Sequence, residues 1–213
     1  MTDHTLYLLR HGETEFNIAG RLQGQQDSPL TARGRVQARG HGALLATLID
    51  DPAAWRVVAS PLGRTMDTAR LACAELGLPE TAIETDPRLM ELAYGEWEGL
   101  TYDEIETRYR DDWAARQRDP WGFVVPGGES YAMVAARAGA FLAVPRGNTI
   151  VVSHGGTGRV LRGLYARLAP LEIKTLEQPQ DALHCLTQGT IARIGHLECG
   201  ESSIAIDSAP SSP

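Results

Sequence analysis

The chain has 213 residues, of which 43% are hydrophobic and 22% are charged, as in an ordinary globular protein. A chain of this length can bury one sizeable core, so we expect a single domain over residues 1–199. The net charge of −7 argues against a general nucleic-acid binder and against a protein that docks on anionic membranes. No apolar run approaches the roughly 20 residues of a membrane helix, and the opening MTDHT predicts no signal peptide. Three scattered cysteines predict no disulfide framework, and we expect a cytoplasmic protein.

Short apolar runs alternate with helical patterns along the first part of the chain. Residues 5–9 (TLYLL) predict a buried strand. Thr31 predicts the N-cap of a helix that runs to about Leu48. Residues 55–59 (WRVVA) predict a second buried strand.

The same alternation continues after the second strand. Ser60 and the proline that follows it predict the start of a helix, and Gly77 predicts its end. Residues 149–153 (TIVVS) predict a third strand, and a further helix follows from Gly155. Because these strands are solidly apolar, the pattern predicts a mostly parallel sheet with helices on both faces, an α/β fold.

The end of the chain differs from the body. Leu183–Leu186 and Thr190–Ile194 predict a closing pair of strands around a Gln-Gly turn. The tail from Gly200 to Pro213 is rich in Ser, Pro and Gly and predicts disorder.

Charged and nucleophilic residues follow three of the predicted strands. The first strand leads into Arg10 and His11, the second into a helix whose first turn carries Arg64, and the third into His154. Ligands of α/β folds bind beyond the carboxyl ends of the strands. If these strands are neighbours, two histidines and two arginines meet in one crevice. Arg64 lies where the helix dipole disfavours a cation, which favours a bound anion nearby.

Six blocks of the sequence, in order, resemble those of the histidine phosphatase superfamily, which includes the cofactor-dependent phosphoglycerate mutases. The blocks are LYLLRHGETEFN (6–17), RLQGQQDSPLTARG (21–34), SPLGRTMDTA (60–69), ELAYGEWEG (91–99), PGGES (126–130) and VVSHGGTGRVL (151–161). The resemblance covers about residues 5–196 and implies a phosphoglycerate mutase-like three-layer sandwich. It also implies a cap-like insertion at about residues 92–130.

The resemblance implies a role for each of the principal residues. His11 would be the nucleophile that becomes phosphohistidine, and Arg10, Arg64 and His154 would hold the phosphoryl oxygens. Glu91 would be the general acid for the leaving group. Such chemistry needs positioned cations, because a phosphoryl group in transfer spreads negative charge over its oxygens. The other residues that we expect at phosphate or substrate are Asn17, Gln23, Tyr94 and Gly155.

We expect neither a metal nor another cofactor. The sequence contains no HxH, no H-E-x-x-H and no Asp/His cluster at ligand spacing, and the remaining histidines are scattered. The expected partners are a small-molecule phosphate ester and inorganic phosphate as product, and we expect no nucleic acid or membrane partner.

Two reactions fit the resemblance. Residues 100–130 have the W…DP…PGGES pattern that resembles broad-specificity and α-ribazole-phosphate phosphatases, and they depart from the pattern of the mutases. This favours a phosphomonoesterase, with a phosphoglycerate mutase as the alternative. The presence of all the principal residues argues against a catalytically silent binding module. Four arginines could bind a substrate carboxylate or form an exposed face: Arg108, Arg110, Arg116 and Arg118.

The charge of the insertion predicts a substrate preference. Residues 80–129 hold 13 acidic and five basic residues, a net charge of −8. We therefore expect esters with a neutral body to be preferred, packed against Tyr94, Trp97 and Trp121.

Overall fold

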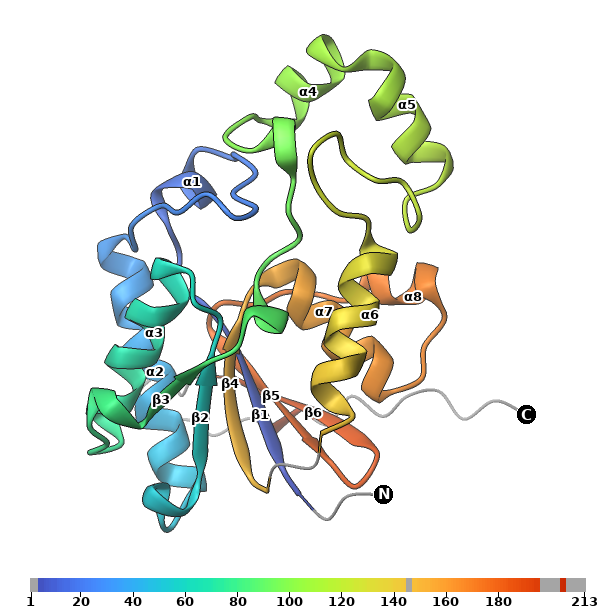
Figure 1. The fold of residues 1–213 in the computed structure, drawn as a ribbon. Helices are drawn as coiled ribbons and strands as arrows, with labels where there is room; N and C mark the ends of the chain where they lie inside the picture. Colours follow the sequence, from blue (N-terminus) through green and yellow to red (C-terminus); the bar gives the residue numbers. More distant parts are fainter. Residues whose placement is uncertain (1–3, 145–146, 196–203, 206–213) are drawn as a thin grey trace.

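The computed structural model describes residues 4–144, 147–195 and 204–205. Its centre is a seven-stranded sheet in the order β3-β2-β4-β1-β5-β6-β7 (Figure 1). Strands β1 to β4 pair in parallel, whereas β5, β6 and β7 add antiparallel pairs. The α/β class is confirmed, and the sheet is mixed. The strands are β1 (Leu6–Arg10), β2 (Arg56–Ala59), β3 (Ile83–Thr85), β4 (Thr149–Ser153), β5 (Ala182–Thr187), β6 (Thr190–Gly195) and β7 (Ile204–Ala205).

Helices cover both faces of the sheet (Figure 1). Leu9 of β1 belongs to one apolar cluster with Leu45 of α2 and Ala72 of α3. The preceding Leu8 belongs to a second cluster with residues of α6, α7 and α8, because successive side chains of a strand point to opposite faces. The three-layer arrangement is therefore confirmed. The α-helices are α1 (Glu15–Ile18), α2 (Ala32–Leu48), α3 (Gly63–Glu75), α4 (Tyr102–Arg108), α5 (Arg110–Arg118), α6 (Tyr131–Leu142), α7 (Gly155–Tyr165) and α8 (Pro170–Thr175).

The chain between β3 and α6 extends away from the sheet and carries α4 and α5, at the top of the view in Figure 1. It is joined to the segment after β1 by backbone hydrogen bonds, from Leu22 to the carbonyl of Leu100 (2.9 Å) and from Gly99 to the carbonyl of Leu22 (2.7 Å). These helices fall within the insertion expected at about 92–130, whose role as a cap stays a prediction. Four 3₁₀ turns complete the described elements: η1 (Pro52–Ala54), η2 (Glu80–Ala82), η3 (Pro87–Leu89) and η4 (Gly95–Trp97).

The ends of the first long helices follow the sequence signals in part. The hydroxyl of Thr31 accepts a hydrogen bond from the backbone of Gly34, so it caps α2 as predicted. Gly77 follows α3 with a φ of +69°, a conformation that suits glycine. The prediction that Ser60 caps α3 is wrong, because Leu62 occupies the N-cap.

The end of the chain is described only in part. The predicted closing pair of strands is confirmed as β5 and β6, which form an antiparallel pair. Within the tail that we expected to be disordered, Ile204–Ala205 pairs with β6. The rest of residues 200–213 lies outside the described residues. None of the described helices is long and apolar enough to cross a membrane.

Candidate active site

The two principal histidines lie side by side at the carboxyl ends of neighbouring strands. Arg10, the last residue of β1, is in register with Ser153, the last residue of β4. His11 and His154 follow these partners directly, and their ring centroids are 5.3 Å apart. Strand β2 lies on the other side of β4, and its successor Ser60 has its hydroxyl 2.8 Å from Nε2 of His154. The predicted convergence of these strand ends is therefore present.

His11 is held as a neutral imidazole in one tautomer. Its ring is buried, and Nδ1 lies 2.8 Å from the backbone carbonyl of Gly12. Because a carbonyl only accepts, we assign the proton to Nδ1, which leaves Nε2 with a lone pair. Burial lowers the pKa of His11 well below its ordinary value, and the charges of Arg64 and Arg10 lower it further. A neutral ring with a free Nε2 lone pair is suited to nucleophilic attack.

The loop that carries His11 is fixed by close backbone packing. A Cβ on Gly12 would lie 2.1 Å from the carbonyl oxygen of Gly34, near the start of α2, so a side chain does not fit there. The backbone N–H of Gly12 donates to the hydroxyl of Thr68 on α3 (3.1 Å). A Cβ on Gly34 would lie 2.0 Å from the carbonyl oxygen of Glu13, so this position also requires a glycine, although glycine has a low helix propensity.

Arg64 is buried at the start of α3 and is bonded only in part. Its Nη atoms donate to the carbonyls of Gly24 and Gln26, both at 2.7 Å, and Nη1 also lies 3.2 Å from the carboxylate of Asp27. Its Nε is buried and has no hydrogen-bond partner among the described residues. Unpaired buried donors are costly, and a bound anion would satisfy this one.

Three further buried polar atoms around His11 are also without partners in the described part of the chain. They are Nε of Arg10, Nδ1 of His154 and the side-chain oxygen of Gln23. Arg10 is fixed by a 2.6 Å hydrogen bond from Nη1 to the carbonyl of Gln178, and burial lowers its pKa to about 10. At that pKa the guanidinium remains charged near neutral pH. Two fixed cations with unused donors therefore flank the neutral His11.

Glu91 reaches the N-terminus of α7 from the segment before the insertion. Its carboxylate accepts hydrogen bonds from the backbone N–H groups of Gly156 (2.9 Å) and Thr157 (3.0 Å), and from its neighbour Leu92 (2.9 Å). The N-terminus of a helix attracts a carboxylate through these unsatisfied donors. Glu91 is thereby held beside the histidines.

A cavity of about 230 Å³ opens between these groups. Seven of the nine predicted site residues line it, whereas His154 and Gly155 do not. His154 and Gly155 line an adjoining smaller pocket that shares Arg10, Arg159 and Gln178 with this cavity. The predicted residues that line the cavity are Arg10, His11, Asn17, Gln23, Arg64, Glu91 and Tyr94.

Asn17 has a fixed orientation that the sequence did not reveal. Its side-chain oxygen accepts hydrogen bonds from the backbone of Thr14 (3.2 Å) and from the amide of Gln180 (3.0 Å). The same amide of Gln180 donates to the carbonyl of His11 (3.2 Å). With its oxygen occupied, Asn17 keeps its amide donors for the cavity that it lines.

Several cavity residues were missed by the sequence analysis. Arg159 lies three residues after Gly156 on α7, so helical spacing could have placed both on one face. No signal marks Gln178, which belongs to a loop without periodic pattern. The other missed residues that line the cavity are Arg21, Leu22, Gly24, Tyr102 and Tyr131.

The four arginines considered for a substrate carboxylate do not line the cavity. Arg108, Arg110 and Arg118 are exposed on α4 and α5. Arg116 lies over the ring of Trp97, 5.7 Å from its centroid, and Trp97 is fully buried in the core. Trp121 stacks on Tyr131 and does not line the cavity.

No three His, Cys, Asp or Glu side chains of the described ranges are grouped in a way that could hold a metal ion.

Comparisons with known proteins agree with this geometry. The family model of the histidine phosphatase superfamily (branch 1) matches residues 6–193. A protein named "Probable phosphoglycerate mutase GpmB" from Enterobacter sp. (strain 638) is 39% identical over 155 residues, which are 70% of this chain and 69% of the relative.

Two solved phosphatases have the same fold. The α-ribazole phosphatase from Shigella flexneri has a TM-score of 0.72 and 26% identity, with 95% of each chain covered. The mycobacterial glucosyl-3-phosphoglycerate phosphatase, solved with VO3, has a TM-score of 0.70 and 26% identity, with 98% of this chain and 100% of that chain covered. The family match spans most of the residues from which the site is built. The chain belongs to the histidine phosphatase superfamily.

Proposed function

We propose that the protein is a phosphomonoesterase that acts through a phosphohistidine at His11, without a metal. Nε2 of His11 attacks phosphorus, and the bond between phosphorus and the ester oxygen breaks. The departing oxygen takes a proton from Glu91. Water then attacks the phosphohistidine, Glu91 accepts a proton from that water, and the bond from Nε2 to phosphorus breaks to release inorganic phosphate.

The observation that carries this proposal is the pairing of a neutral His11 with unused donors of fixed cations. Nε of Arg10 and of Arg64 are buried and unpaired among the described residues, and both side chains line the cavity with His11. Such donors stabilise charge on the equatorial oxygens during phosphoryl transfer. His154, whose ring centroid lies 5.3 Å from that of His11, adds a further buried nitrogen, Nδ1, without a partner among the described residues.

Glu91 is the acid and base of this proposal because of its place. Among the residues that the structure describes, it is the only carboxylate that lines the cavity with His11. Its hydrogen bonds to Gly156 and Thr157 fix the carboxylate without covering it on the cavity side, since Glu91 still lines the space. A positioned carboxyl group contributes typically 10² to 10⁴-fold by proton transfer, an order-of-magnitude range.

Hydrolysis is favoured over the mutase alternative by the place of the arginines on the insertion. A mutase must retain a phosphoglycerate after phosphoryl transfer and present its second hydroxyl. None of the four arginines considered for its carboxylate lines the cavity. Incubation with 3-phosphoglycerate tests the choice. Release of inorganic phosphate in step with substrate loss supports the proposal, whereas conversion to 2-phosphoglycerate with little phosphate release supports the mutase.

We expected a preference for neutral esters on the premise that the acidic residues of the insertion face the pocket. The lining of the cavity contradicts this premise. Of the 13 acidic residues in 80–129, only Glu91 lines the cavity, whose other charged residues are arginines. Glu98, for example, accepts hydrogen bonds from the backbone of Gln25 (2.9 Å) and Gln26 (3.0 Å). The arginines that line the cavity are Arg10, Arg21, Arg64 and Arg159.

We therefore propose esters whose leaving group is polar and carries a second negative charge. Arg159 has no carboxylate partner within the described chain, whereas Arg21 pairs with Glu104 (2.9 Å). The matched esters glycerol 3-phosphate and 3-phosphoglycerate differ by a carboxylate. We expect 3-phosphoglycerate to have the higher kcat/KM at low salt, with the difference reduced in Arg159→Met. A preference for glycerol 3-phosphate would contradict this substrate class and leave the hydrolytic proposal standing.

A further inference from the structure

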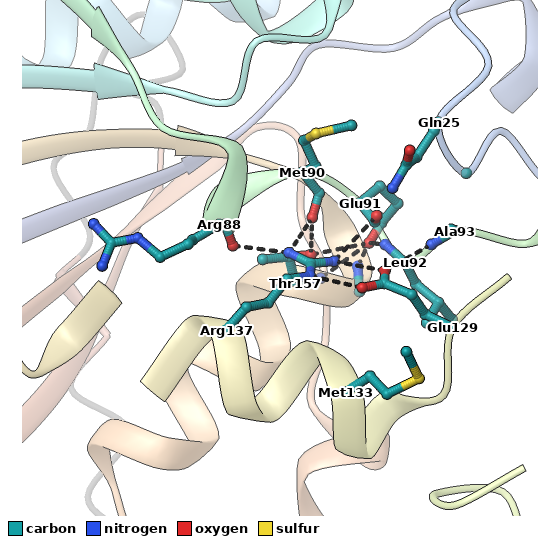
Figure 2. A network of polar contacts seen from close by, with 12 residues as sticks. Gln25, Arg88, Met90, Glu91, Leu92, Ala93, Glu129, Met133, Arg137 and Thr157 are labelled. Carbon is teal, nitrogen blue, oxygen red and sulfur yellow. Dashed lines mark hydrogen bonds and ion pairs between the residues drawn. The ribbon is translucent and has the colours of Figure 1, made fainter. Parts of the chain in front are cut away.

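One half-buried arginine outside the cavity holds the segment that presents Glu91. Arg137 lies on α6, its side chain is 18% exposed, and it does not line the cavity. Figure 2 shows its guanidinium directed at the backbone of the residues that precede the insertion. The resemblance assigned no role to this residue.

All five N–H donors of Arg137 are used. Nε and Nη2 donate to the two carboxylate oxygens of Glu129, each at 3.0 Å, in a bidentate pair. Nη1 donates to the carbonyls of Arg88 (2.8 Å) and Met90 (2.7 Å), and Nη2 donates to the carbonyl of Glu91 (3.2 Å). Because a guanidinium carries five donors, none remains for a ligand. The contacts therefore point to positioning rather than to substrate binding.

Glu129, at the far end of the insertion, forms hydrogen bonds with the same segment, residues 88–93. Its carboxylate accepts from the backbone N–H of Ala93 (3.0 Å), and its own N–H donates to the carbonyl of Ala93 (2.8 Å). A Cβ on Gly128 would lie 2.3 Å from that carbonyl, so the glycine permits the close approach. Residues 88–93 lead out of the sheet and Glu129 leads back, so the pair with Arg137 closes the base of the insertion.

The opposite side of the segment is held by β4 and α7. The hydroxyl of Ser153 donates to the carbonyl of Leu89 (2.9 Å), and the hydroxyl of Thr157 donates to the carbonyl of Met90 (2.6 Å). The carbonyl of Met90 thus accepts from both sides, from Thr157 and from Arg137 (Figure 2). Movement of this backbone by a fraction of an ångström would move the Glu91 carboxylate relative to the N-terminus of α7.

We propose that Arg137 and Glu129 are positioning residues that fix Glu91 for proton transfer. This inference rests on the proposed role of Glu91 as the general acid. Loss of the pair leaves Arg10, Arg64 and His11 untouched, because neither residue contacts them. The defect should therefore appear in proton transfer to the leaving group and not in binding of the phosphoryl group.

The test compares Arg137→Lys and Glu129→Gln with the unmodified enzyme on an alkyl phosphate and on nitrophenyl phosphate. Lysine keeps the charge but loses the bidentate pair and most of the donors. We expect kcat on the alkyl ester to fall by about 10²-fold and kcat on the nitrophenyl ester by less than about 5-fold, since nitrophenolate needs little protonation. The inhibition constant of inorganic phosphate should stay within about 2-fold, because the anion-binding donors are unchanged. Equal losses on both esters would overturn the positioning role.

Arg88→Met is the matched control. Arg88 also connects this segment to α6, through a hydrogen bond from its Nη1 to the carbonyl of Ala140 (3.0 Å). Its other side-chain hydrogen bonds go to the carboxylate of Asp86 and not to residues 90–93. Its replacement should leave the ratio of the two esters unchanged. An altered ratio in Arg88→Met would show that any loosening of the segment suffices and would contradict a specific role for Arg137.

The variant Glu91→Gln separates this inference from the proposed function. If Glu91→Gln slows both esters equally, the proposed acid is wrong. If it slows the alkyl ester selectively and Arg137→Lys does not, the positioning inference alone is wrong. In the double variant, Arg137→Lys should cost the alkyl ester less than about 3-fold beyond Glu91→Gln, because residues that act as a unit are not additive. Glu129→Gln keeps the test available if Arg137→Lys fails to fold.

Discussion

Arg64 keeps a buried positive charge available for an anion. Two backbone carbonyls, those of Gly24 and Gln26, hold its Nη atoms, so little of its orientation depends on an acidic partner. Asp27 lies within 3.2 Å but is 43% exposed, and water screens its charge. A buried charge without hydrogen-bond partners is strongly destabilising. The two carbonyls reduce this penalty for Arg64, because they accept hydrogen bonds from its Nη atoms. The remaining Nε has no partner among the described residues, and in the proposed mechanism it donates to a phosphate oxygen.

Arg64→Lys should lower kcat/KM by at least about 10²-fold, because a lysine cannot keep both carbonyl bonds and offer a further donor in the same plane. Steady-state rates and inhibition by inorganic phosphate measure the loss. Arg70→Lys is the control on the same helix, since Arg70 is exposed and pairs with Asp67 and Glu80. Turnover of Arg64→Lys near that of the unmodified enzyme would contradict the proposal that Arg64 holds the phosphoryl oxygens.

The N-terminus of α7 is the element that brings Glu91 to the histidines. Its N–H groups bind the carboxylate, and the absence of a side chain at Gly156 permits the approach. A Cβ at Gly156 would lie 2.6 Å from Oε1 of Glu91, which is too close for an unshifted carboxylate.

Gly156→Ala should therefore slow esters with poor leaving groups by about 10²-fold or more, the scale of lost general acid catalysis. Nitrophenyl phosphate should be affected much less. Gly158→Ala on the same helix is the matched control, because its Cβ would meet Leu8 only at an ordinary distance of 3.9 Å. Both substitutions replace a helical glycine, so a similar rate profile for the two variants would argue against displacement of Glu91.

The ends of the helices and strands were predictable from the sequence where they depend on neighbouring residues. Thr31 and Gly77 were placed correctly because a cap and a left-handed terminator depend on neighbouring residues alone. Ser60 was misplaced because its hydroxyl lies 2.8 Å from His154, which is 94 residues away in the sequence. The strand ends that carry His11 and His154 were predictable because parallel strands bring such residues to one edge.

Residues whose partners are distant backbone groups could not be predicted. Arg137 binds carbonyls of residues 88–91, and a carbonyl has no signature in the sequence. Gln180 binds Asn17 and the carbonyl of His11 from a loop without periodicity. The preference for neutral esters, which we predicted from the charge of the insertion, lacked support for a related reason. Composition does not say which carboxylates face the cavity.

Across the whole molecule, several buried histidines are kept neutral by folding. Burial is the first cause that lowers the pKa of His11 and His154 well below the ordinary value. Burial also lowers the pKa of His184 to about 3, with further contributions from Arg162 and Arg193. The unfolded chain binds protons at these positions below about pH 6.5, whereas the folded chain does not. Stability is therefore fully present above that pH and is lost as the pH falls.

The free energy of unfolding should decrease on acidification from pH 6.5 to 5, with each such histidine contributing a slope of up to about 1.4 kcal/mol per pH unit. His184→Gln should reduce the slope by about one proton, and its amide oxygen can replace the acceptor that Arg162 uses at 2.9 Å. Urea unfolding at several pH values measures this. His4→Gln is the control, since His4 is exposed. Identical slopes in both variants would contradict a neutral buried His184.

In the proposed mechanism, His11 carries the phosphoryl group between ester and water. Rapid quenching of the enzyme with a labelled phosphate ester tests it most directly. We expect a labelled protein that is stable in base and labile in acid, with the label on the peptide that contains His11. His11→Ala should fold, as judged by circular dichroism, and should trap no label. Turnover with no labelled protein trapped during the pre-steady-state phase would contradict a phosphohistidine at His11, and so would an active His11→Ala variant.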